Sequence, residues 1–449
     1  MDVIQCLTCG EKWTRGAGPD HDGAAAPMHC PDHAVRMGDA DQLSAIVKKS
    51  SRSARRSSIA GHNVSRARFN LSATRSPGLW IIAALAIVAV GAWFVMAAAQ
   101  SPPYPQSTAI LGITWDFANK VRAAQGSDLW PTTWASDGSL YAAWGDGGGA
   151  FGSDTACRVH FGLHTLTGSP PSFTFNNLFG CKADGAGCIS GVTHSAACNA
   201  PFGDPAATFG TPDGLLAVGN TLYAIVWSPG GSMLHTSTNG GQAWTESGWV
   251  FPYVAGSFVP TSFLQFGQGY AGARDGFVYL IGMNLGDSTR IYLARAPVGS
   301  IMTQSAWQYF TGTAAAPTWG AWASATAIFR DPAAAWGSGS MQYFPVLGRY
   351  IFIHLFGQIQ QLHVFDAPEP WGPWTTVYYN DAWGSYGTQD VVSYNIVPKF
   401  ISSNNLIFWM TFSGGGGSGS DNWDNYNLIK GTFTLPDARP APPTGFQVR

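Results

Sequence analysis

The sequence has little charge and, in its larger part, almost no glutamate. Asp, Glu, Lys and Arg together make up 11% of the 449 residues. Beyond residue 100 the only glutamates are Glu246 and Glu369, so paired acidic chemistry there must come largely from aspartates. The same part has 13 basic and 19 acidic residues, a balance of 13 − 19 = −6. Nucleic acid requires a basic face for its phosphates, so this composition excludes it as a partner and favours a neutral polymer.

Glycine and tryptophan, by contrast, are abundant, with 55 and 19 residues. Together with the low charge, this balance is typical of an extracytoplasmic all-β domain. The length allows two or three domains. The sequence predicts five parts. They are a zinc-ribbon-like segment (1–40), a basic linker (41–77), a transmembrane helix (78–99), an all-β body (107–435) and a Pro-rich tail (436–449).

The first segment contains two pairs of potential metal ligands, Cys6 with Cys9 and Cys30 with His33. About twenty residues separate the pairs, which is the spacing of a small zinc ribbon. Three thiolates and one imidazole would form a closed tetrahedral site, so we expect structural Zn²⁺ here and no cofactor for catalysis. The alternative is a set of free cytosolic thiols.

An apolar stretch follows a basic segment that contains no acid between residues 48 and 75. Residues 79–99, LWIIAALAIVAVGAWFVMAAA, are long enough to span a bilayer as a helix. Basic residues flank this stretch only on its N-terminal side, which predicts a cytoplasmic N-terminus and an extracytoplasmic body. A cleaved signal peptide is the alternative, but a leader of 78 residues before the apolar core is far too long. We therefore expect a single-pass, uncleaved membrane anchor.

Four further cysteines, Cys157, Cys181, Cys188 and Cys198, are close together after the apolar stretch. An even number in an oxidising compartment indicates two disulfides. Their pairing is open, as is the oligomeric state of the chain.

Five similar segments recur through the body: DGSLYAAW, GNTLYAIVW, DGFVYLIGM, GRYIFIHLF and NNLIFWMTF, at residues 137–144, 219–227, 275–283, 348–356 and 404–412. Each pairs a turn signal with a hydrophobic strand, and each interval can hold a four-stranded antiparallel sheet. Radial repetition of such sheets predicts a five-bladed β-propeller. A β-sandwich is the main rival, which the length and the even recurrence disfavour.

One hairpin marker supports the propeller. Residues 237–244, STNGGQAW, match the Asp-box pattern Ser-x-Asp-x-Gly-x-Thr-Trp with Asn and Ala in place of Asp and Thr. That pattern marks a turn with a packed tryptophan and carries no chemistry.

Residues 126–149, GSDLWPTTWASDGSLYAAWGDGGG, combine carboxylates with aromatic rings. Asp128 precedes the expected strand and Asp146 follows it, so both are candidates for the acid and base of a glycosidase. Trp130, Trp134 and Trp144 are candidates for binding sugar rings. The alternative is that an aspartate in such a loop only bonds its own backbone in a turn.

Several motifs together resemble a known family: GSDLWPTTW, LYAAWGDGGG, YAGARDGFVYL, IYLARAP and FDAPEPWGPWTTVYY. They are similar to a bacterial domain of unknown function, number 4185, since placed among the endo-D-arabinanases of glycoside hydrolase family 183. The resemblance covers most of residues 108–435. It implies a five-bladed propeller that cuts the D-arabinofuranose chains of mycobacterial-type cell walls, with Asp128 and Asp146 at essential acidic positions.

Asp275 in the motif ARDG is a third catalytic candidate, with Arg274 beside it to bind substrate. A neighbouring cation would keep this carboxylate ionised, which predicts a supporting role and at least a tenfold loss of turnover in Asp275→Ala. The position of Asp275 before its strand, like that of Asp137, favours a plain turn residue instead. The overall expectation is a membrane-anchored glycoside hydrolase acting on arabinan-type polysaccharide. A non-catalytic carbohydrate-binding or scaffold propeller at the cell envelope is the alternative.

Overall fold

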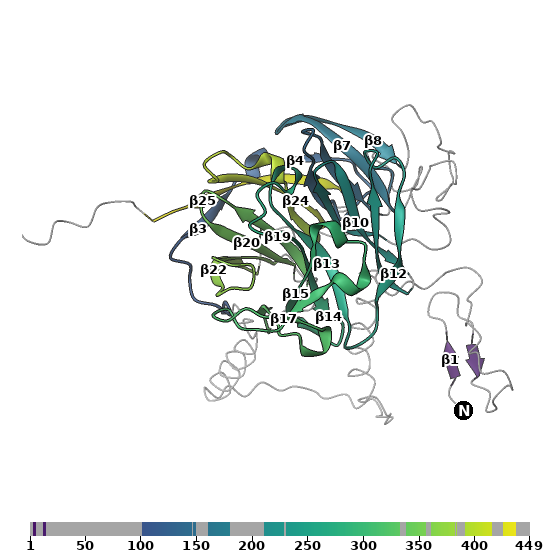
Figure 1. Ribbon diagram of the computed structural model, residues 1–449. Helices are drawn as coiled ribbons and strands as arrows, with labels where there is room; N and C mark the ends of the chain where they lie inside the picture. The colour runs from purple at the N-terminus through teal and green to yellow at the C-terminus, as the bar shows by residue number, and fades with distance from the viewer. Residues whose placement is uncertain are drawn as a thin grey trace, which may run out of the picture. The chain divides into compact units, whose positions relative to one another are not determined.

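The computed structural model describes residues 3–5, 12–14, 101–145, 147–149, 160–179, 211–228, 230–332, 338–355, 361–381, 383, 391–414 and 425–436. The chain separates into two compact units, Met1–Phe69 and Asn70–Arg449. In the first unit, β1 (Val3–Gln5) and β2 (Lys12–Thr14) form an antiparallel hairpin (Figure 1).

Several of the sequence predictions lie outside the described residues. They are the zinc ligands Cys6, Cys9, Cys30 and His33, the apolar segment 78–99, the four later cysteines and Asp146. Within the described ranges, no helix is long and apolar enough to cross a membrane.

The second unit is all-β, as the sequence predicts: the helices among its described residues are 3-10 turns of three residues each. Two of its sheets are four-stranded antiparallel meanders (Figure 1). The first contains β5 (Thr132–Trp134), β6 (Leu140–Trp144), β7 (Gly162–Ser169) and β8 (Ser172–Phe179). The second contains β9 (Pro212–Val218), β10 (Thr221–Ser228), β11 (Gly231–Ser237) and β12 (Thr245–Pro252).

A ten-stranded sheet combines two further meanders, joined by parallel pairing of β13 with β19. One contains β13 (Phe258–Gln265), β14 (Phe277–Asn284), β15 (Asp287–Pro297), β16 (Gln308–Phe310) and β17 (Trp319–Gly320), with β18 (Phe329–Arg330) paired to β15. The other contains β19 (Ser338–Phe344), β20 (Arg349–Leu355), β21 (Leu362–Ala367) and β22 (Thr375–Asn380).

The last sheet joins the two ends of the body. It contains β23 (Val391–Ile396), β24 (Ile407–Gly414) and β25 (Tyr426–Thr434), and β25 also pairs with β3 (Gly112–Trp115) and β4 (Val121–Ala123). The β3 to β25 ladder matches Gly112 with Thr434 and Trp115 with Gly431. A strand from the start of the body therefore completes the sheet built by its end.

The five recurrent segments of the sequence form equivalent strands. They correspond to β6, β10, β14, β20 and β24, each of which is the second strand of its meander. The first strand of each meander, namely β5, β9, β13, β19 and β23, is here called the inner strand. The repeat in the sequence therefore marks a repeat of structure.

The inner strands run in the same direction. Backbone bonds of 3.0 Å connect the segments that follow β5, β9 and β13, from Ser136 N to Gly219 O and from Gly219 N to Gly269 O. β19 is parallel to β13. β23 runs in the same direction as β5. Thr132 Oγ1 in β5 donates to Ile396 O in β23, and farther along both segments Lys399 Nζ donates to Gly138 O.

This common direction defines two ends of the body. The inner strands begin at one end, called the loop end, and finish at the other, called the turn end. The connections from β6 to β7, β8 to β9, β20 to β21, β22 to β23 and β24 to β25 all join strands at the loop end. Long connections held by a rigid sheet scaffold are where binding and catalytic residues concentrate.

The Asp-box hairpin lies between β11 and β12, at the turn end. Ser237 Oγ accepts the amide of Gly241 at 2.9 Å, and Asn239 Oδ1 accepts the amide of Ala243 at 2.9 Å. The Trp244 indole donates to Gly241 O at 2.9 Å and packs edge-on against Phe161. An asparagine oxygen thus closes the turn where the pattern has aspartate.

Candidate functional site

Asp128 lies at the loop end, just before the inner strand β5. Its backbone pairs with Gly145 through two hydrogen bonds, Asp128 N to Gly145 O at 3.2 Å and Gly145 N to Asp128 O at 3.1 Å. The structure therefore holds Asp128 beside the residue that precedes Asp146 in the sequence. The two segments that the sequence offers as sources of catalytic carboxylates do meet.

The glycine-rich segment after β6 packs tightly on the approach to β5. A Cβ at Gly147 would lie 1.8 Å from Gly126 O, so only glycine fits there. Gly149 N donates to Ser127 Oγ at 2.9 Å, and the Trp144 indole donates to Gly147 O at 2.8 Å. These contacts fix the backbone on both sides of the Asp128 to Gly145 pair.

The tryptophans predicted to bind sugar rings have other positions. Trp130 and Trp144 are both 0% exposed, and the imidazole of His164 is stacked on each ring, at centroid distances of 5.5 Å and 5.4 Å. Burial lowers the pKa of His164 to about 3, so this ring is neutral. Trp134 is at the turn-end limit of β5, away from Asp128. None of the three rings presents a face to a substrate at the loop end; Trp130 and Trp144 form the core beneath the site.

Asp213, which the sequence interpretation missed, occupies the start of the next inner strand, β9. It is a bulge residue: Pro212 pairs with Val226 and Gly214 pairs with Ile225, so Asp213 is the extra residue between them. Bulges of this kind re-aim a side chain and are frequent next to active sites. Burial of the carboxyl group raises the pKa of Asp213 to about 7, and the Ser232 hydroxyl offsets only part of this effect.

Asp213 and Asp128 belong to adjoining segments. A Cβ at Gly145 would lie 2.9 Å from Thr211 Cγ2 and 3.1 Å from Asp128 Oδ1, so Thr211 and Asp128 contact the same glycine. Thr211 is two residues before Asp213. The motif TPDG preceding a recurrent strand could have indicated this acid, because the strand before each repeat is the inner one.

Tyr253 is a polar neighbour of Asp213. Its backbone nitrogen donates to Gly230 O at the loop end, and its side chain is partly exposed. Burial and the charge of Asp213 raise the pKa of Tyr253, so its hydroxyl stays protonated and can donate a hydrogen bond.

The space between the inner strands is too small for a sugar. A narrow cavity there is lined by residues from all five, including Thr132, Leu215, Ser262, Gln342 and Asn395. Its free volume is about 20 Å³, which has room for a water molecule. A polysaccharide must therefore bind outside this cavity.

The structure does not bring Asp275 to the end where Asp128 lies. Asp275 is exposed before β14 at the turn end, where its carboxylate accepts the Phe277 amide at 3.0 Å and the Tyr279 hydroxyl. Arg274 pairs with Glu369, with Nη1 to Oε2 at 2.8 Å and Nη2 to Oε1 at 3.0 Å. The neighbouring cation thus serves a different carboxylate, and Asp275 has the contacts of a turn residue.

Another group of titratable side chains combines two histidines of the fourth meander with the aspartate that follows β18. Asp331, His354 and His363 are buried, and their possible ligand atoms all lie within 4.8 Å of one another. This arrangement could hold a metal ion.

Part of this chain is similar to a known domain family. Residues 204–412 match the model of a family described as a domain of unknown function, DUF4185. The resemblance seen in the sequence motifs is therefore confirmed for this part of the chain. No curated protein matches the chain.

Solved structures show a remote likeness. A putative hydrolase from Bacteroides ovatus ATCC 8483 is 12% identical, with a TM-score of 0.41, over 69% of this chain and 86% of that one. The catalytic domain of the Coprinopsis cinerea GH62 alpha-L-arabinofuranosidase is 12% identical, with a TM-score of 0.40, over 74% and 96%. A putative exo-beta-1,3-galactanase from Bifidobacterium bifidum s17 is 10% identical, with a TM-score of 0.40, over 74% and 97%. At these scores the likeness carries no activity over to this chain.

Proposed function

We propose that the body is a glycoside hydrolase acting on a furanose polysaccharide, with D-arabinan of the cell wall as the substrate and internal cleavage as the reaction. The proposal is carried by the position of the Asp213 carboxyl group, which adjoins the segment that holds Asp128 and whose desolvation raises its pKa to about 7. Glycosidases need one carboxyl group that stays protonated and another that is ionised. The motif resemblance supplies the substrate class.

In this proposal Asp213 is the general acid. A carboxyl with a pKa of about 7 is protonated in about half of the molecules at neutral pH, which suits proton donation to a leaving oxygen. Asp128 is the base or nucleophile. Asp146, next to the glycine that pairs with Asp128, is the rival for either role. A carboxylate separation of about 5 Å would favour a nucleophile, and about 6.5–9.5 Å would leave room for water.

The rest of the architecture belongs to the same proposal. The five meanders are blades of a propeller, and the pairing of β3 with β25 supports such a closure. Residues 78–99 anchor the chain in the membrane, with the body on the extracytoplasmic side where a wall polysaccharide is found. Because Trp130 and Trp144 are buried, we assign the aromatic contact with substrate to Tyr253, whose protonated hydroxyl lies near Asp213.

The test is release of reducing ends from D-arabinan by the full-length chain in detergent micelles. Asp128→Asn and Asp213→Asn should each lower release by at least a hundredfold, about 2.7 kcal/mol of barrier. Asp275→Asn is the matched control, because its carboxyl is exposed at the turn end. Binding of arabinan without release by the parent protein would identify a carbohydrate-binding propeller, and neither binding nor release would identify a scaffold.

A further inference from the structure

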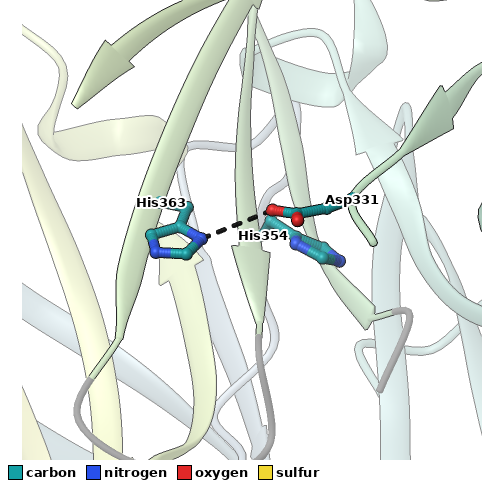
Figure 2. A group of neighbouring side chains, drawn as sticks. All are labelled: Asp331, His354 and His363. Atoms are coloured by element: carbon teal, nitrogen blue, oxygen red, sulfur yellow. Dashed lines mark ion pairs between the residues drawn. The ribbon is translucent and has the colours of Figure 1, made fainter. Parts of the chain in front are cut away.

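Three buried side chains from separate segments converge beside the strands of the fourth meander. Asp331 follows β18, His354 belongs to β20 and His363 belongs to β21. They are 1%, 0% and 0% exposed. Figure 2 shows the three side chains gathered between the strands, with the carboxylate of Asp331 facing the ring of His363.

The spacing of the atoms suits a shared ion. His363 Nδ1 lies 3.6 Å from Asp331 Oδ2, which is too long for a hydrogen bond between these two atoms. A tetrahedral zinc ion with bonds of about 2.0–2.1 Å holds neighbouring ligand atoms about 3.3 Å apart. A ring nitrogen of His354 also lies within 4.8 Å of His363 Nδ1 and of the Asp331 carboxylate oxygen. Small side-chain movements would bring all three to ligand distance.

The other nitrogen of His363 supplies an independent observation. Nε2 lies 3.0 Å from Asp381 Oδ1, and the same oxygen accepts Gln361 Nε2 at 3.2 Å. The ring of His363 is also stacked on Tyr379 at a centroid distance of 3.5 Å. A histidine that binds a metal typically gives its second N–H to a carboxylate, which fixes the ring and its tautomer. Asp381 and Tyr379 hold His363 with Nδ1 directed at Asp331.

We propose that Asp331, His354 and His363 bind one divalent transition-metal ion, with zinc as the best match, and that Asp381 orients His363 as an outer partner. Two imidazoles and a carboxylate favour zinc over magnesium or calcium, which prefer oxygen ligands alone.

The proposed ion is structural. Asp331 N donates to Thr289 O at 3.0 Å, and β18 pairs with β15 of the third meander. His354 and His363 belong to the fourth meander. The ion therefore ties the strand that crosses from the third meander to the strands of the fourth.

The experiment must separate this site from the zinc expected at the N-terminus. Four proteins in micelles are loaded with Zn²⁺ and dialysed before their metal content is measured: the full-length parent, Cys9→Ser, His363→Gln and the double variant. We expect two equivalents of zinc in the parent, one in each single variant and none in the double variant. Asp331→Asn in the Cys9→Ser background should bind zinc at least tenfold more weakly. The control is His235→Gln in that background, a histidine 1% exposed in the second meander, which should keep one equivalent.

A second readout tests the chemistry of the site as well as its metal content. Co²⁺ added to the Cys9→Ser protein should give visible absorption bands without the thiolate-to-cobalt charge-transfer band of a cysteine site. Chelation of the zinc-loaded Cys9→Ser protein should lower its melting temperature and leave that of the double variant unchanged. Zinc content that is the same with and without His363→Gln, or a Cys9→Ser protein that takes up neither Zn²⁺ nor Co²⁺, would overturn the proposal.

Discussion

Replacing Asp213, the acid at the start of β9, should make the protein more stable and less active. Asp213→Asn keeps the size of the side chain and removes its ionisation. The pKa of Asp213 is raised from 3.8 to about 7 in the folded chain, because burial disfavours the charged form. The folded state therefore binds the proton more tightly than the unfolded state, and stability declines as pH rises from about 4 to about 7.

The size of the effect follows from the shift. About three pKa units at about 1.36 kcal/mol each give an upper limit of about 4 kcal/mol at pH 8. The side chain is partly exposed, so water screens part of this cost, and we expect about 1–4 kcal/mol. At pH 8 Asp213→Asn should exceed the parent in free energy of unfolding by that amount. At pH 4 the carboxyl is protonated in the folded state and in about 40% of unfolded molecules, so the difference should fall below about 1 kcal/mol.

The assay is urea unfolding of both proteins between pH 4 and 8, together with reducing-end release from arabinan over the same range. Release by the parent should fall as pH rises through about 7, since the ionised acid cannot donate a proton. Asp275→Asn serves as control and should show neither effect. A stability difference that does not change with pH, or an active Asp213→Asn protein, would refute the assignment of Asp213 as a buried general acid.

Three further predictions concern Asp275 and the N-terminal cysteines. Asp275→Ala, for which the sequence interpretation expects at least a tenfold loss of turnover, should keep turnover within about threefold and lose about 1 kcal/mol of stability with its turn hydrogen bonds; a tenfold loss without unfolding would restore its supporting role. Cys9→Ser should remove about one zinc per chain, because it deletes a thiolate from a closed site. An unchanged zinc content would contradict the zinc-ribbon hypothesis. A thiol label that cannot cross membranes should leave Cys6 and Cys9 unmodified in intact cells, whereas labelling would reverse the orientation.

Local patterns in the sequence were sufficient for the class of fold. Alternation of apolar residues after a turn signal is a property of neighbouring residues, so the segments at 137–144 and 275–283 could be recognised as equivalent strands. The turn at residues 237–244 was recognisable for the same reason, since its hydrogen bonds join residues at most four positions apart. Asp128 could be named as a candidate because residues 126–149 combine two further aspartates with three tryptophans in one short segment.

Contacts between distant residues needed the tertiary structure. Trp130 was expected at a sugar, but its indole donates to the carbonyl of Asn425, which is 295 positions away and makes the ring part of the core. Arg274 was expected to bind substrate and to keep Asp275 ionised, but its guanidinium pairs with Glu369, which is 95 positions away. Asp213 became a candidate only once a bulge and its burial were known.

The strands and their turns could be predicted from local sequence, because backbone alternation and turn chemistry depend on residues within a few positions. The tertiary structure decided which polar side chains share a site. Asp331, His354 and His363 show the reason: nothing in their spacing indicates a metal, and their convergence depends on the register between β20 and β21, which pairs His354 with His363, and on the position of β18 beside β15. Register and sheet order are set by the packing of whole strands, so no single motif contains them.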